Sequence, residues 1–110
     1  MSLPKPPLTL GVEEEYQIID PVTRDLYAYI SELVSQDREA TESLDLKPEF
    51  MQSQVEVGTK VCQDIKGVRE EVIRLRRAVV DMAERNGVAI AAASTHPFAS
   101  WLHQPITEGV

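Results

Sequence analysis

The longest regular pattern in the sequence is an apolar stripe between residues 65 and 82. Its side chains recur at alternating steps of three and four residues, the spacing of one face of an α-helix. The stripe consists of Ile65, Val68, Val72, Leu75, Val79 and Met82. Asp64 precedes it as a predicted N-cap, and Asn86-Gly87 follows it as a predicted left-handed C-cap. The sequence therefore predicts one long helix whose apolar face packs on another layer of the fold.

Two segments alternate apolar and polar residues with the period of a β-strand. In the first, Thr9 to Asp20, the apolar parity holds Leu10, Val12, Tyr16 and Ile18, and the other holds Glu13, Glu15 and Gln17. In the second, Glu49 to Thr59, two valines face away from a polar set. The valines are Val55 and Val57, and the polar set is Gln52, Gln54 and Glu56. Each segment therefore predicts a strand with one apolar and one polar face.

The other segments are less regular. Leu26 to Ile30 follows a turn that begins at Asp20-Pro21, and we interpret it as a short hairpin partner of the first strand. Ser31 to Leu44 fits either a weak helix or an acidic loop. Val88 to Thr95 is apolar almost without interruption, which predicts a third strand in a central position. Together these elements predict an α+β fold, an antiparallel sheet with a long covering helix.

Composition limits the classes of function. There are 18 acidic and 11 basic residues, a net charge of −7. This charge disfavours binding to nucleic acid or to an anionic membrane and suits a pocket that recruits cations. No apolar run reaches the length of a membrane span. Cys62 is the single cysteine, so we expect a buried spectator thiol and a reducing, cytoplasmic compartment.

Three consecutive glutamates lie in the middle of the first predicted strand. Glu13 and Glu15 project from the same face, with Cα atoms roughly 6.5–7 Å apart, and Glu14 points the other way. Carboxylates that close repel unless a cation lies between them, and Mg²⁺ prefers such oxygen ligands. If the two strands pair, Glu56 could join this group, whereas Glu49 has the opposite parity and needs a bulge. The alternative is that these side chains only face solvent.

Other candidate residues have two interpretations each. Glu14 is either paired with a basic residue under the sheet or part of an interface. His96, before a proline at the end of the third predicted strand, either binds substrate or caps a turn. Four arginines on the predicted helix indicate solvated faces or ion pairs: Arg69, Arg74, Arg76 and Arg77.

Three stretches together resemble a known family. They are LTLGVEEEYQIIDP at residues 8–21, LKPEFMQSQVEVGTKVC at 46–62 and ASTHPFASW at 93–101. Their sequence and order resemble the N-terminal part of the carboxylate–amine ligase group within the glutamate–cysteine ligase type 2 family. Members are several times longer, so we expect residues 1–110 to be an incomplete N-terminal portion of one ligase domain.

The resemblance implies an ATP- and Mg²⁺-dependent ligase that joins a glutamate-like carboxylate to a cysteine-like amine through an acyl phosphate. It implies metal ligation by Glu13, Glu15, Glu56 and Glu49, and it places His96 near the substrate; it assigns no catalytic residue. It also implies a curved sheet related to glutamine synthetase. We expect small-molecule substrates, no nucleic-acid or membrane partner, a homo-oligomer, and no activity from this portion alone. The alternative function is a non-catalytic acidic α+β module for dimerisation or binding.

Overall fold

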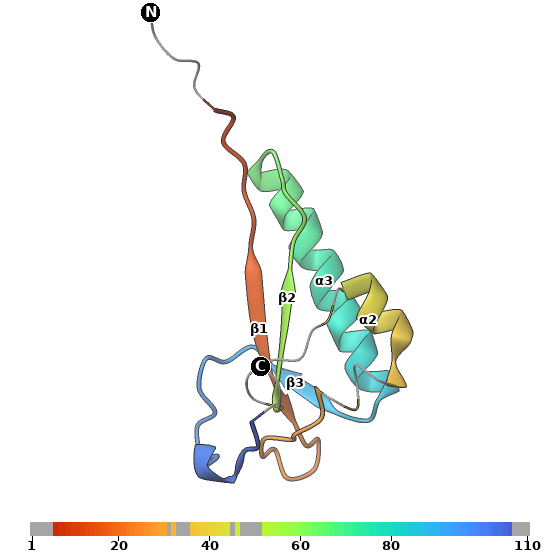
Figure 1. Ribbon diagram of the computed structural model, residues 1–110, viewed down its shortest axis with the longest axis vertical. Helices are drawn as coiled ribbons and strands as arrows, with labels where there is room; N and C mark the ends of the chain where they lie inside the picture. The colour runs from red at the N-terminus through yellow and green to blue at the C-terminus, as the bar shows by residue number, and fades with distance from the viewer. Residues whose placement is uncertain (1–5, 31, 33–35, 45, 47–51, 107–110) are drawn as a thin grey trace, which may run out of the picture.

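The structure is a computed structural model, and it describes residues 6–30, 32, 36–44, 46 and 52–106. The elements follow in the order β1 (Glu13–Ile19), α2 (Arg38–Leu44), β2 (Gln54–Gly58), α3 (Ile65–Arg85), β3 (Ala89–Ala91) and the 3₁₀ turn η1 (Trp101–His103). Figure 1 shows the two long strands beside α3, with α2 against the lower part of that helix. The structure therefore confirms the α+β fold predicted from the sequence.

The three strands form one antiparallel sheet in the order β2-β1-β3. β1 is therefore the central strand, and the prediction that the third strand lies centrally is wrong. β3 has only three residues, pairs with β1 alone and is partly exposed. Its sequence is Ala-Ile-Ala, and alanine has little side chain to bury between two neighbours. In this protein the uninterrupted apolar run that begins at Val88 thus forms an edge strand.

The long helix has the predicted bounds. The Asp64 side chain accepts a hydrogen bond from the Gly67 backbone amide at 2.8 Å, and Asn86 caps the other end. Gly87 follows in the left-handed conformation, with φ of 68°, which glycine adopts without steric cost. Local side-chain and backbone chemistry therefore fixes both ends of α3.

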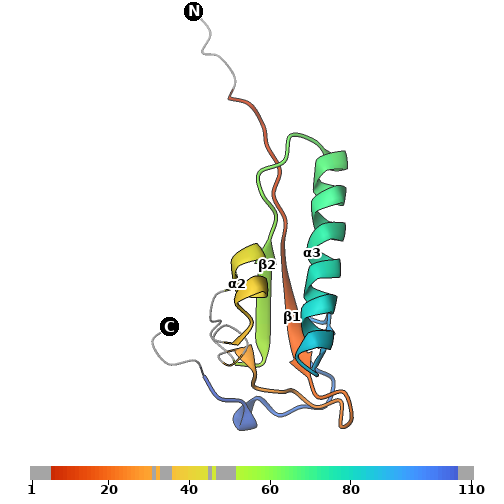
Figure 2. The same ribbon diagram turned by 90° about the vertical axis from the view of Figure 1, so that its right-hand side faces the viewer.

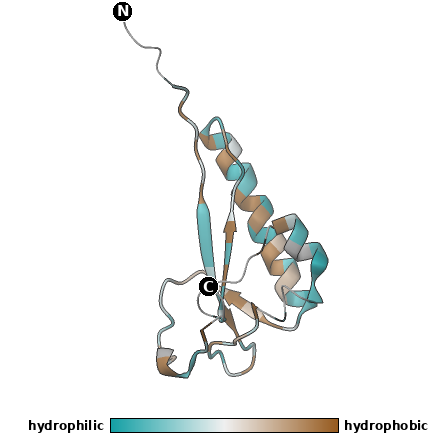
Figure 3. Ribbon diagram, in the orientation of Figure 1, coloured by the Kyte–Doolittle hydropathy of each residue, from teal (hydrophilic) through white to brown (hydrophobic). Residues whose placement is uncertain are grey.

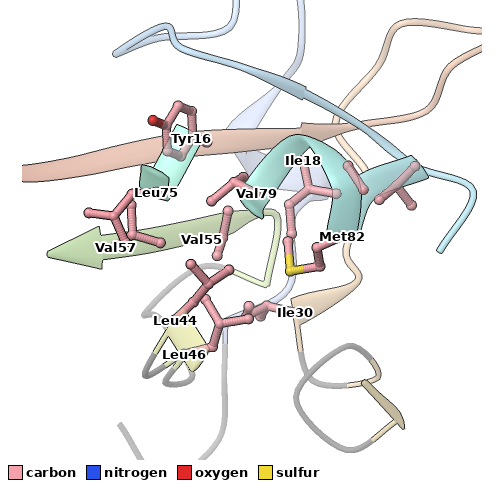
Figure 4. Close-up of a cluster of buried hydrophobic side chains, with 12 residues drawn as sticks. Tyr16, Ile18, Ile30, Leu44, Leu46, Val55, Val57, Leu75, Val79 and Met82 are labelled. Carbon is pink, nitrogen blue, oxygen red and sulfur yellow. The ribbon is translucent and has the colours of Figure 1, made fainter. Parts of the chain in front are cut away.

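Only part of the apolar stripe on α3 is covered. Leu75, Val79 and Met82 are buried against the sheet, whereas Ile65 at the start of the helix is 72% exposed. Figure 4 shows these three side chains meeting those of β1 and β2, with Ile30, Leu44 and Leu46 beside them. The buried cluster comprises Tyr16, Ile18, Ile30, Leu44, Leu46, Val55, Val57, Leu75, Val79, Met82, Ala83 and Val88. The core is therefore a single apolar layer between the sheet and the lower two-thirds of α3.

The segments between β1 and β2 differ from their simplest predictions. Leu26 forms one bridge with Ile19 rather than a strand, and the Tyr29 and Ile30 amides both donate to the Gln52 carbonyl oxygen. For Ser31 to Leu44 the helical alternative is confirmed over Arg38–Leu44, where α2 ends at the buried Leu44, and residues 31 and 33–35 lie outside the described residues. Hairpin pairing of residues 26–30 is thus limited to a single bridge.

Both helices lie on one face of the sheet. In Figure 1 they are to the right of β1 and β2, and Figure 2 shows α3 running along the strands. The segment after β3 lies on the other side, at the lower end of the sheet. Figure 3 shows that β1 is hydrophilic over its upper half, where the three glutamates lie. Within the described ranges, no helix is long and apolar enough to cross a membrane.

Candidate functional site

The pairing of β1 with β2 brings carboxylates to the face of the sheet opposite the helices. Glu15 lies directly across from Glu56, and Glu13 lies across from Gly58. Residues directly opposite each other in an antiparallel pair project from the same face. Glu13, Glu15 and Glu56 therefore share one face, as their parity predicts, and all three are at least partly exposed.

The carboxylates on this face are adjacent but do not enclose a metal site. Gln54 donates its side-chain amide to Glu15 Oε1 at 3.1 Å, which partly fills the space between the strands. Among the residues that the structure describes, no three carboxylate, imidazole or thiol groups are close enough to hold a metal ion. Glu49, the fourth predicted ligand, lies outside the described residues. The arrangement thus offers part of a ligand set on an open surface.

Glu14 points to the opposite face and forms an ion pair there. Arg76 of α3 contacts both of its carboxylate oxygens, at 2.9 and 2.6 Å, and the Tyr16 hydroxyl donates to Oε1 at 2.9 Å. The Arg76 hydrogen bond lowers the pKa of Glu14 despite the opposing effect of burial. Burial is the main cause that raises the pKa of Tyr16, and the hydrogen bond to Glu14 is the second. The paired interpretation of Glu14 is therefore confirmed.

His96 connects the segment after β3 to the turn after β1. Its Nδ1 accepts hydrogen bonds from the Phe98 and Ala99 backbone amides at 3.2 and 3.1 Å. Because Nδ1 accepts, the neutral ring carries its proton on Nε2, which donates to the Arg24 carbonyl oxygen at 2.6 Å. The turn-capping interpretation of His96 is thus confirmed, since both ring nitrogens are engaged within the chain.

A cavity of about 210 Å³ lies beside this histidine on the open face of the sheet. It is lined by Gln17, Ile19, Arg24, Ala91, Ala93, His96, Pro97 and Phe98. A second hollow, of about 470 Å³, is lined by Glu13, Glu14, Glu15, Arg76, Ala92, Ala93 and Ser94. Ala93 lines both, so the cavity and the hollow adjoin at this residue, and the hollow also includes the Glu14–Arg76 pair from the helix side of the sheet.

Sequence analysis did not identify Gln17 as a residue of the site. Its parity placed it with the exposed glutamates, yet its side chain is only 5% exposed. Ala91 pairs with it from β3, and residues 93 and 94 lie over its amide group. No local signal could have revealed this burial, because the covering residues are more than 70 positions away in the sequence.

A buried carboxylate on α3, Glu71, was also missed. It pairs with Arg74 at 2.7 Å and accepts a hydrogen bond from the Lys60 backbone amide at 3.2 Å. The hydrogen bond from Arg74 is the main cause that lowers the pKa of Glu71 to about 2, and the hydrogen bond from the Lys60 amide is the second. The spacing of three residues between Glu71 and Arg74 on a predicted helix could have indicated this ion pair. The ion-pair interpretation of Arg74 is therefore confirmed.

The Glu71 pair closes one end of the fold around Cys62. This cysteine is buried, and its thiol donates to the Lys60 carbonyl oxygen at 3.3 Å. Leu10 and Cys62 also exchange two backbone hydrogen bonds of 2.8 Å. These contacts agree with the predicted spectator thiol, and they hold the start of α3 to the chain preceding β1.

Comparison with known proteins agrees with these motifs. The sequence model described as Glutamate-cysteine ligase family 2 (GCS2) matches residues 9–109. Proteins named "Putative glutamate--cysteine ligase 2" are 50% identical in Chloroflexus aurantiacus, 46% in Roseiflexus castenholzii and 50% in Herpetosiphon aurantiacus. The matched regions cover 90%, 92% and 91% of this chain. They cover 25%, 26% and 26% of those relatives, so the chain spans about a quarter of their length. The chain belongs to glutamate-cysteine ligase family 2.

Proposed function

We propose that this chain is the N-terminal part of an ATP- and Mg²⁺-dependent ligase that joins a carboxylate to an amine through an acyl phosphate. Family membership supports ligase chemistry, because the relatives are named as glutamate–cysteine ligases. The resemblance supplies the glutamate-like and cysteine-like substrates and the glutamine-synthetase-like sheet as parts of the same proposal. ATP and the two amino-acid substrates are the partners it requires.

The register of β1 against β2 carries the metal part of this proposal. It sets Glu15 opposite Glu56, with Glu13 two residues away on the same uncovered face. Transfer of the γ-phosphoryl group to a carboxylate brings several anions together, and divalent cations neutralise them. Glu13, Glu15 and Glu56 would hold such an ion, together with Glu49 and with ligands beyond this chain. A helix-backed sheet holds ligands in place better than a loop.

His96 would act on the substrate indirectly. Its ring holds the Phe98 and Ala99 amides to the Arg24 carbonyl group, and Arg24, His96 and Phe98 all line the cavity. The proposed role of His96 is therefore to position this wall of the substrate region.

Activity belongs to the whole protein in this proposal. The chain offers only part of a ligand set, so we propose that residues 1–110 alone form no active ligase. A net charge of −7 supports the absence of nucleic-acid and membrane partners. A cytoplasmic location is part of the proposal, since ATP and a free thiol substrate occur together in a reducing compartment.

The test is ATP-dependent amide formation from glutamate and cysteine in a protein of the relatives' length that contains this chain. We expect Glu13→Gln, Glu15→Gln and Glu56→Gln each to reduce kcat/KM by at least about 100-fold, because groups that merely orient a metal ligand are already worth ~10- to 100-fold. They should also raise the Mg²⁺ concentration needed for half-maximal rate. Glu70→Gln, on the exposed side of α3, is the matched control. Undiminished turnover in the three variants would show that the metal assignment is wrong.

One observation favours the second candidate function, a non-catalytic module that dimerises. Three apolar side chains are exposed near the start of α3: Leu8 at 89%, Val61 at 68% and Ile65 at 72%. A second copy of the chain could cover them. Sedimentation velocity of the 110-residue chain tests this function: a dimer that Ile65→Asp dissociates would support the module, and a monomer at all concentrations would exclude it. A homo-oligomer of the ligase remains part of the main proposal.

A further inference from the structure

Gln17 is a buried polar side chain on the open face of the sheet, and only its amide nitrogen has hydrogen-bond partners among the described residues. It is 5% exposed, so its amide has little access to water. Its Nε2 donates to the Ala93 and Ser94 carbonyl oxygens over long distances of 3.4 and 3.5 Å. Within the described residues, no hydrogen bond reaches its Oε1. A buried amide oxygen without a donor costs free energy, so this group is suited to a ligand that brings one.

The cavity beside Gln17 has the size and polarity of a subsite for a small organic group. Its volume is about 210 Å³, below the ~300–1,000 Å³ of a complete ligand pocket. The methyl groups of Ala91 and Ala93, the Ile19 side chain and the Phe98 ring are its apolar boundaries. The Phe98 ring lies edge-on to His96, with centroids 4.3 Å apart. Arg24, Gln17 and His96 complete the lining, and an uncharged side chain of a few carbon atoms fits the apolar part of it.

The cavity also lies next to the carboxylates proposed to hold the metal ion. Gln17 is two residues after Glu15 on the same face of β1, hence roughly 6.5–7 Å away at Cα. Ala93 lines both the cavity and the hollow that contains Glu13 and Glu15. A group bound at Gln17 would therefore lie beside the carboxylates proposed to hold the metal ion rather than at a separate place on the surface.

We propose that this cavity binds the amine substrate, with Gln17 Oε1 accepting a hydrogen bond from the amine N–H and the alanine-lined wall receiving a short, uncharged side chain. The inference rests on the proposed ligase function. In the step concerned, the amine nitrogen attacks the acyl carbon, the C–N bond forms and the C–O bond to phosphate breaks. Inorganic phosphate leaves and takes up the proton lost by nitrogen. Gln17 orients the nucleophile, since an amide oxygen does not act as a base at neutral pH.

Two alanines set the size limit of the site. Ala91 lies on the open face because it pairs with Gln17, and Ala93 follows two residues later. Leucine at position 93 adds three carbon atoms to the wall, and Ala93 is partly exposed, so the fold tolerates the change. Such a change should act on side-chain size alone and leave the hydrogen bond to Gln17 in place.

The experiment measures amide formation with alanine, 2-aminobutyrate, leucine and lysine as amine acceptors, in a protein of the relatives' length that contains this chain. Gln17→Leu should raise KM for 2-aminobutyrate about 10-fold or more, given the cost of an unmade hydrogen bond in a buried site. Ala93→Leu should lower kcat/KM for 2-aminobutyrate relative to alanine about 10-fold, the usual worth of a methylene in a tight pocket.

Matched variants control for general effects. Gln63→Leu makes the same substitution as Gln17→Leu, and Val80→Leu also enlarges an apolar side chain to leucine; both positions are exposed and away from the cavity, and neither variant should alter these ratios. If the Gln17 and Ala93 variants instead change KM for glutamate and leave the amine series unaltered, the cavity belongs to the carboxylate substrate and the inference is overturned.

An NMR titration separates failure of the binding site from failure of the ligase proposal. The Gln17 side-chain amide resonances, assigned by their loss in Gln17→Leu, are titrated with 2-aminobutyrate. Shifts that saturate, and that Ala93→Leu abolishes, support the site even in a protein that makes no amide from ATP. Absence of shifts in a protein that does turn over ATP overturns the site and leaves the ligase proposal standing.

Discussion

Partial coverage of the apolar stripe on α3 predicts very different costs for truncating a side chain at its start and in its middle. Leu75 is 2% exposed and Ile65 is 72% exposed, although both belong to the same helical stripe. Leu75→Ala removes three carbon atoms from a buried site, worth ~2.4 kcal/mol at about 0.8 kcal/mol per methylene. The cavity left behind adds to this cost, so we expect a loss of about 3 kcal/mol in the free energy of unfolding.

Ile65→Ala should cost far less. Only about a quarter of its side-chain surface is removed from water, so ~0.7 kcal/mol is at stake, and the higher helix propensity of alanine offsets a few tenths of this. The expected loss is about 0.3 kcal/mol. Urea unfolding followed by circular dichroism measures both variants of the 110-residue chain, with unchanged slopes as the check that the transition is comparable. Equal losses would show that the start of α3 is covered as fully as its middle and would refute the difference in burial between the two positions.

Three further predictions concern single contacts. Because the pKa of Glu71 is lowered to about 2, its stabilising effect is fully present above the ordinary value of 4.5 and is lost as pH falls through about 2. Glu71→Gln should therefore flatten the dependence of unfolding free energy on pH between 4.5 and 2, as measured by urea titrations. Arg76→Met should raise the pKa of Glu14 toward its ordinary value, because the main cause of its lowering is removed; carboxyl NMR titration tests this, and an unmoved pKa would contradict it. His96→Ala should speed hydrogen exchange at the two backbone amides that donate to Nδ1, and unchanged exchange rates would show that the ring does not hold this segment.

Features set by neighbouring residues could be predicted from the sequence. The bounds of α3 follow from Asp64 and Asn86-Gly87, whose caps depend on atoms within a few positions. The shared face of Glu13 and Glu15 follows from the alternation of a strand. Their register against Glu56 needed the assumption that the strands pair, and the structure shows that they do.

Features set by distant contacts could not be predicted. Burial of Gln17 depends on residues 91–94, and the acceptor for His96 Nε2 is a carbonyl group 72 positions away. The position of β3 at the edge was missed for the same reason, since apolar content does not tell whether one or two strands will pair with a segment. Long-range packing thus explains why the apolar half of the site was not recognised.

The three consecutive glutamates act together to fix the orientation of β1. A slip of one residue in β1 would exchange its faces. Glu14 would then leave Arg76 unpaired, and Glu13 and Glu15 would enter the apolar layer under α3, where unpaired carboxylates are costly. The Glu14–Arg76 pair therefore opposes such a slip, as does the burial of Tyr16 and Ile18. The middle glutamate is thus the residue of the three whose ion pair fixes which face the outer two present.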